Sequence, residues 1–235
     1  MEYLDKGLLF MGVYAVYLVG KQLLDMLPPL DVSSLYCKDK PNPYVLQCND
    51  MTINNKLNPH TIIVGNSGSG KSKLAEYLVK DRIDIDVTLI NCYPDDFVTL
   101  PDARRITEVK EVVEYLENVL TTVHEMPLYL IVDEVLALSM QDKKINKLLT
   151  TIVAKGRHHG VFLIVIAQYG TREELPFKNL VGNRIAFNMI EVSNYNTILG
   201  YQPESPQLRP REFYFLTTTK GKSRCPLLKE YQQGS

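Results

Sequence analysis

Residues 61–72 read TIIVGNSGSGKS and join an apolar run to a glycine-rich turn. The first four residues of this stretch are all β-branched or apolar and end at a glycine, which is typical of a short buried strand. The remainder matches G-x-x-x-x-G-K-[ST] in full, and residues 72–80 follow with the pattern of a helix. This order predicts a phosphate-binding loop made of Gly65, Asn66, Ser67, Gly68, Ser69, Gly70, Lys71 and Ser72.

The residue types of this loop fit a nucleoside triphosphate. The glycines let backbone N–H groups surround phosphate oxygens, because no Cβ stands in the way. The helix that begins near Lys71 directs its positive end at the same anion. Lys71 adds a charge for the β- and γ-phosphates, and the Ser72 hydroxyl is a ligand for Mg²⁺. The loop therefore predicts ATP and Mg²⁺ as the bound cofactors.

A second strand carries two acids at its end. Residues 128–132 read LYLIV and are followed at once by Asp133 and Glu134. Two adjacent carboxylates beside a buried strand are costly unless a positive charge lies near them, and Mg²⁺ would supply that charge. We assign Asp133 to the metal, through water, and Glu134 to the attacking water as general base.

A polar amide follows the most apolar strand of the chain. Residues 161–167 read VFLIVIA, and Gln168 comes directly after them. Gln168 is predicted to lie between the strands that lead to Lys71 and to Asp133, where it would contact the γ-phosphate or its water. A simple amide that satisfies a strand end is the alternative.

Basic residues outside the loop give further candidates. Phosphoryl transfer leaves charge on γ-oxygens that an arginine can stabilise, in some systems from a neighbouring subunit. Arg157 is the candidate for this role, with Arg184 as the second choice. Arg172 and Lys178, in the segment after Gln168, are candidates for contact with DNA phosphates, although the acids at 173–174 favour a mixed, solvated loop.

From residue 60 onward, apolar strands alternate with amphipathic helices. This alternation predicts an α/β fold with a mostly parallel sheet and helices on both faces. Such sheets bind ligands at the carboxyl ends of their strands. Thr107 is predicted to cap the second helix. The remaining expected strands are 87–90, 185–187 and 213–216, and the remaining expected helices are 109–123 and 145–153.

The chain divides into three predicted parts. Residues 1–30 form an apolar helix whose uncharged run, 7–20, is shorter than the roughly 20 residues that span a bilayer. It is either docked or interfacial, or a short membrane anchor, and a secretory signal fits poorly. Residues 31–58 are a lead-in, predicted as a hairpin or an irregular cover. Residues 59–235 form the nucleotide-binding domain.

The net charge of the chain limits which kinds of partner the composition can indicate. The 235 residues carry a formal net charge of −1, so no global basic field indicates a nucleic-acid binder. A local basic patch, or one built only in an oligomer, remains compatible with this charge.

Later motifs resemble the FtsK/HerA superfamily of DNA-translocating ATPases. Residues 154–168, AKGRHHGVFLIVIAQ, are similar to the family's sequence of Gly-Arg, glycine turn, apolar strand and glutamine. Residues 183–187, NRIAF, followed by TILG at 197–200, are similar to a second family block. The resemblance covers about residues 60–217. Tyr169 departs from it, since the family often continues there with arginine and proline.

The resemblance implies a RecA-like P-loop NTPase core in which Asp133 and Glu134 are the acidic pair and Gln168 is the sensor. It also implies a ring-shaped homo-oligomer, a hexamer, with double-stranded DNA in its channel. A ring reconciles DNA binding with a net charge of −1, because a few basic loops are repeated around the pore.

The compact length resembles the genome-packaging ATPases of tailless icosahedral viruses with an internal membrane, and also small coupling ATPases of plasmids and conjugative elements. We expect viral packaging into a preformed capsid, with conjugative transfer or segregation as the alternative. Under either hypothesis we expect the protein in the cytoplasm or on the cytoplasmic face of a membrane. If it is viral, that place is a host cell or a virion vertex. A membrane protein or a portal protein is a further expected partner. A small-molecule P-loop kinase and a nucleotide-binding scaffold without turnover are the alternatives of other classes.

Overall fold

The computed structural model describes residues 42–205 and 207–228. The predicted helix within residues 1–30 lies outside these ranges. Among the residues described, no helix has both the length and the apolar character needed to cross a bilayer.

The elements alternate as the sequence pattern predicts. The strands are β1 (Val45–Cys48), β2 (Met51–Asn54), β3 (Thr61–Val64), β4 (Asp86–Ile90), β5 (Arg104–Ile106), β6 (Leu128–Val132), β7 (Val161–Ala167), β8 (Asn183–Ala186), β9 (Glu212–Leu216) and β10 (Lys220–Arg224). The helices are α3 (Lys71–Val79), α4 (Val109–Asn118), α5 (Val135–Gln141), α6 (Lys144–Lys155) and α7 (Ser193–Leu199), with 3-10 turns η1 (Gly156–His159) and η2 (Lys178–Leu180).

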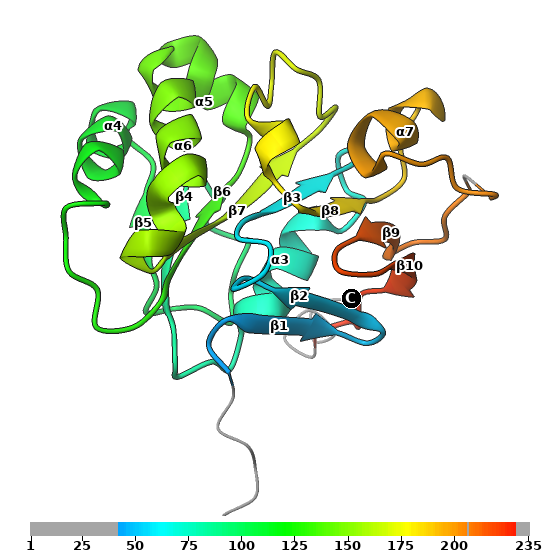
Figure 1. The fold of residues 1–235 in the computed structure, drawn as a ribbon, viewed down its shortest axis with the longest axis horizontal. Coiled ribbons are helices and arrows are strands. Elements are labelled where there is room, and N and C mark those ends of the chain that lie inside the picture. The colour runs from blue at the N-terminus through cyan, green and yellow to red at the C-terminus, as the bar shows by residue number, and fades with distance from the viewer. Residues whose placement is uncertain (1–41, 206, 229–235) are drawn as a thin grey trace, which may run out of the picture. The chain divides into compact units, whose positions relative to one another are not determined.

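One eight-stranded sheet organises residues 42–228. Its strand order is β10-β9-β8-β3-β7-β6-β4-β5 (Figure 1). The strands from β8 to β5 in this order all run parallel, whereas β9 pairs with β8 and β10 with β9 in the antiparallel sense. The predicted α/β fold with a mostly parallel sheet is therefore confirmed.

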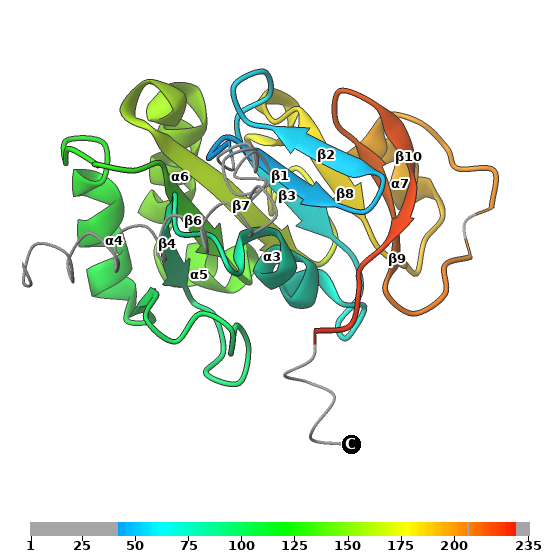
Figure 2. The ribbon, with the colours of Figure 1, turned by 90° about the horizontal axis from the view of Figure 1, so that it is seen from below.

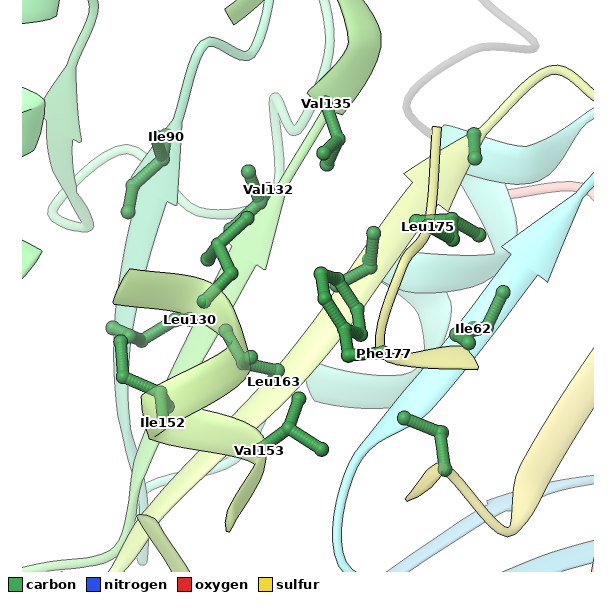
Figure 3. Close-up of a cluster of buried hydrophobic side chains, with 14 of the residues drawn as sticks. Ile62, Ile90, Leu130, Val132, Val135, Ile152, Val153, Leu163, Leu175 and Phe177 are labelled. Carbon is green, nitrogen blue, oxygen red and sulfur yellow. The ribbon is translucent and has the colours of Figure 1, made fainter. Parts of the chain in front are cut away.

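Both faces of the sheet are buried, which explains its continuously apolar strands. Successive residues of β6 alternate between two clusters: Leu130 packs with residues of α4, α5, α6 and α7 on one face, and Ile131 packs with α3 and the β1–β2 hairpin on the other. Figure 1 shows the sheet between these two layers, Figure 2 views the side with the hairpin, and Figure 3 shows the first cluster.

The lead-in segment contains a hairpin. β1 and β2 pair in the antiparallel sense and bury Leu46 and Ile53 completely. Tyr129 of β6 fixes the hairpin to the sheet, because its hydroxyl donates to the Pro43 carbonyl at 2.8 Å and accepts from the Asn55 amide at 3.0 Å. The hairpin thus covers part of the face of the sheet on which α3 packs.

The second helix begins at the predicted residue, Val109, but its predicted cap and its predicted end were wrong. α4 begins at Val109 with Glu108 as its N-cap residue, and no side chain caps it, so Thr107 does not have the predicted role. The helix ends at Asn118 rather than near Val123, whose side chain is 91% exposed. Beyond Val119 no apolar side chain of this segment is fully buried, so the core no longer supports a helical face there.

Buried His60, directly before β3, predicts a pH dependence of stability. Its Nδ1 accepts the Leu163 backbone N–H at 3.0 Å, so this nitrogen carries no proton. Burial lowers the pKa of His60 from 6.5 to about 4. The unfolded chain therefore binds a proton in this window that the folded chain does not, and stability falls as the pH falls from 6.5 to about 4.

We expect this group to contribute a loss of about 3 kcal/mol over that window. Chemical denaturation of wild type and His60→Gln across the pH range measures it, because other titrating groups are common to both. The free energy of unfolding should fall more steeply for the wild type. Parallel pH profiles would show that His60 is not responsible.

Candidate functional site

Three neighbouring strands bring the predicted residues to one sheet edge. β7 lies between β3 and β6, as predicted for the strand that leads to Gln168. The carboxyl ends of these strands open into a pocket of about 310 Å³. Its lining residues are Ser67, Gly68, Gly70, Lys71, Ser72, Lys73, Tyr93, Asp96, Asp133, Glu134, Ile166, Ala167 and Gln168.

The glycines of the loop are required by its backbone. Gly68 and Gly70 have φ of 70° and 104°, in the left-handed region that side chains disfavour, and Gly70 is the N-cap residue of α3. A Cβ on Gly65 would lie 2.6 Å from the Cβ of Phe187 in the segment after β8. The loop therefore presents bare backbone to the pocket, which is the cradle that a polyphosphate needs.

Lys71 is a buried cation at the base of this cradle, with 9% of its surface exposed. Its Nζ donates to the Asn66 carbonyl at 2.9 Å, across the loop. Burial lowers the pKa of Lys71, and the nearby carboxylates of Asp133, Glu174 and Glu134 oppose this shift. A phosphate group in the loop would stabilise the charged form further.

Ser72 and Asp133 lie together, although 61 residues separate them. The Ser72 hydroxyl donates to Asp133 Oδ2 at 3.1 Å, and the Glu134 backbone N–H donates to Oδ1 at 2.8 Å. Burial raises the pKa of Asp133 to about 6. A hydroxyl and a carboxylate at this distance fit Mg²⁺, which takes few protein ligands and completes its shell with phosphate oxygens and water.

Glu134 has a strained backbone. Its φ of 49° is uncommon for a residue other than glycine, and it directly precedes α5 as the N-cap residue. Its side chain is half-buried and lines the pocket. Strain of this kind persists where surrounding contacts fix the conformation and is frequent at functional sites.

Gln168 lies at the end of β7 with an exposed side chain, and it lines the same pocket. Lys73, Tyr93 and Asp96 also line the pocket, and the sequence did not identify them. Lys73 Nζ lies 2.9 Å from Asp96 Oδ1, which ties α3 to the loop after β4. Lys73 follows the loop motif directly, but no pattern in the sequence marks Asp96.

The candidate arginines lie outside this pocket. Arg157 is exposed in η1, which precedes β7, so the seven-residue strand separates it from Gln168 by about 20 Å. Arg157 therefore does not reach the pocket of its own chain. Arg184 was a wrong candidate, because its guanidinium donates to three backbone carbonyls of its own chain, those of Lys178, Val181 and Ile198.

The segment after Gln168 is less solvated than predicted. Glu173 and Arg172 are exposed, but Glu174 is only 2% exposed. Lys178 Nζ donates to the Gly170 carbonyl at 3.0 Å and is half-buried. Of the two predicted DNA-contact residues, Arg172 remains available at the surface and Lys178 has a structural bond.

The sheet, the loop and the pocket define an α/β fold of the P-loop NTPase class. The fold is similar to that of the pCW3 conjugation coupling protein TcpA, determined with ATPγS, at a TM-score of 0.59 and 17% identity over 77% of this chain and 64% of that one. It is similar to the cytoplasmic domain of the Thermomonospora curvata type VII secretion ATPase EccC, at 0.58 and 18% over 80% of this chain and 29% of that one.

A third similar structure is the genome packaging NTPase B204 of Sulfolobus turreted icosahedral virus 2 in complex with AMPPCP, at a TM-score of 0.52 and 15% identity over 73% of this chain and 98% of that one. This chain thus spans less than two thirds of TcpA and of EccC. At 15–18% identity, these comparisons confirm the fold that the sequence resemblance implies. No protein-family model and no curated protein sequence matches the chain.

Proposed function

We propose that this protein hydrolyses ATP and uses the energy to move double-stranded DNA. The observation that carries the proposal is the meeting of the glycine loop, Lys71, Ser72, the Asp133–Glu134 pair and Gln168 in one pocket. These residues come from three adjacent strand ends, and together they provide an anion cradle, a cation, a metal site and a base.

Each side chain has a separate task. The backbone N–H groups of the loop and the Lys71 ammonium bind the β- and γ-phosphates. The Ser72 hydroxyl directly, and Asp133 through water, would hold Mg²⁺, which would offset the negative charge of the phosphates. Glu134 accepts the proton of the attacking water, and Gln168 orients that water or contacts the γ-phosphate.

The DNA part of the proposal rests on the two kinds of similar structure, one a conjugation coupling protein and the other a genome packaging NTPase. A homo-oligomeric ring, in the simplest case a hexamer, would place Arg157 of one subunit near the pocket of the next. It would also repeat Arg172 around a channel, which supplies local positive charge despite the net charge of −1.

We favour packaging of a viral genome over conjugative transfer. The structural match with B204 covers 98% of that chain, whereas the match with TcpA covers 64% of that chain, and this difference is our reason for favouring packaging. A membrane or portal protein is the further partner that this reading requires, at the cytoplasmic face of a membrane or at a virion vertex.

Phosphate release with Mg²⁺ and ATP, measured with duplexes of increasing length, tests the proposal. We expect turnover to rise with duplex length, since a motor engages long DNA for many cycles. Displacement of a triplex-forming strand from the end of the duplex separates movement from mere stimulation. Phosphorylation of a small acceptor would instead support a kinase, and phosphate release that ignores DNA would contradict the motor.

A further inference from the structure

Glu174 binds the backbone of the segment that carries Gln168. Its Oε1 accepts the N–H of Gln168 at 2.9 Å, and its Oε2 accepts the N–H groups of Tyr169 at 3.0 Å and Gly170 at 2.7 Å. The side chain is only 2% exposed. One carboxylate thus satisfies three consecutive amides at the point where β7 ends.

Such an arrangement has a clear physical rationale. A buried carboxylate is unfavourable unless hydrogen bonds replace its water, and bonds from backbone N–H groups to a charged acceptor are among the stronger ones. Glu174 also lies near enough to Lys71 to favour its charged form. The carboxylate therefore connects the end of β7 electrostatically with the base of the phosphate loop.

The segment itself is folded around Glu174. The Glu174 N–H donates to the Thr171 hydroxyl at 3.2 Å, and Leu175 N–H donates to the Thr171 carbonyl at 2.9 Å. Leu175 and Phe177 are fully buried in the cluster between the sheet and helices α4 to α7 (Figure 3). Glu174 is thus held from its own side by core packing, so it can act as a fixed support rather than as a mobile acid.

Gly170 packs closely against α7, on the side of the turn away from Glu174. Its φ is 63°, and a Cβ there would lie 2.1 Å from Ile198 Cδ1 of α7. The turn after Gln168 therefore has little freedom to move away from Glu174.

We propose that Glu174 is a positioning residue for Gln168: it fixes the backbone at the end of β7 so that the Gln168 amide points into the nucleotide pocket. The inference rests on the proposed ATPase function, in which Gln168 contacts the γ-phosphate or its water. Glu174 acts through Gln168 and touches no substrate.

The test compares Glu174→Gln with Glu173→Gln, an exposed neighbour that undergoes the same chemical change. Glutamine retains the size of the side chain, but one of its two terminal atoms cannot accept a hydrogen bond. We expect Glu174→Gln to lower kcat by about 10- to 100-fold, as a misplaced catalytic group does, with ATP affinity changed less than about 2-fold. Glu173→Gln should match the wild type.

A double-mutant cycle with Gln168→Ala separates positioning from general destabilisation. If Glu174 acts through Gln168, Glu174→Gln causes no further loss of kcat once Gln168 is alanine. Additive losses, or a parallel loss of ATP affinity, would overturn the proposal. Glu174→Asp, which keeps the charge on a shorter side chain, should give an intermediate kcat.

Hydrogen exchange of the amides at 168–170 provides a readout that needs no turnover. We expect Glu174→Gln to speed their exchange while β3 and β6 stay protected, and unchanged exchange would overturn the proposal. A wild-type protein without ATPase activity would contradict only the proposed function. The hydrogen exchange of residues 168–170 would still show whether Glu174 fixes that backbone.

Discussion

Glu134→Gln is expected to bind ATP with close to wild-type affinity and to hydrolyse it about 10²- to 10⁴-fold more slowly, the range that a general base contributes. The amide has the size of the carboxylate but cannot accept a proton from the attacking water. Its backbone at φ 49° is formed equally by glutamine, so the N-cap of α5 should persist. Single-turnover phosphate release and equilibrium nucleotide binding measure the two properties separately.

Glu125→Gln is the matched control for this variant. Glu125 is exposed, precedes β6 and therefore lies at the sheet edge opposite the pocket. It undergoes the same loss of charge and should hydrolyse ATP at the wild-type rate. Wild-type turnover in Glu134→Gln would remove Glu134 from the role of base and revive the reading of a nucleotide-binding scaffold.

The centre of this fold was predictable from the sequence because local pattern and tertiary environment agree there. The prediction for β7 matches its observed limits, Val161 and Ala167, since all of its residues are apolar and all are buried. The loop from Gly65 to Ser72 was equally predictable, because its spacing of glycines, lysine and serine is a complete local motif, and the left-handed φ values of Gly68 and Gly70 are requirements of the loop's own backbone.

The edges were not predictable in the same way. β5 reads RRI and β10 reads KGKSR, and neither shows the apolar or alternating pattern of a buried strand. Both lie at the ends of the strand order, where polar residues are tolerated and a neighbouring strand decides the pairing. α5 and α7 are seven residues each, so neither is long enough to show the repeated apolar spacing that predicts a helix.

A similar division holds for the site. That Asp133, Glu134 and Gln168 line one pocket was predictable, because these residues follow two apolar strands and parallel strands bring their ends together. Arg184 and Glu174 were misjudged because their partners are set by tertiary packing. Arg184 bonds carbonyls that include one from α7, and Glu174 turns back on amides whose orientation no sequence pattern reveals.

Lys71→Ala is expected to weaken ATP binding by about 100-fold or more, because it removes charge-assisted bonds to two phosphates that together contribute about 3 kcal/mol. Hydrolysis at any accessible ATP concentration should fall to background. Nucleotide binding is best followed by calorimetry with Mg²⁺ and a slowly hydrolysed analogue, and Lys110→Ala on the exposed face of α4 serves as the matched control.

The stability of the Lys71→Ala variant shows whether its weaker ATP binding comes from the site itself or from unfolding. Burial lowers the pKa of Lys71, so its charge is held in the fold at a cost, and removing it does not remove a net source of stability from the free protein. The thermal midpoint without nucleotide should therefore stay near that of the wild type, whereas the increase that ATP causes in the wild type should vanish. Lys71→Met, which fills the space of the aliphatic stem, should behave like alanine. If either variant retained tight ATP binding, the phosphates would not lie in the cradle between Gly65 and Ser72, and the assignment of Asp133 and Glu134 to the same reaction would fail with it.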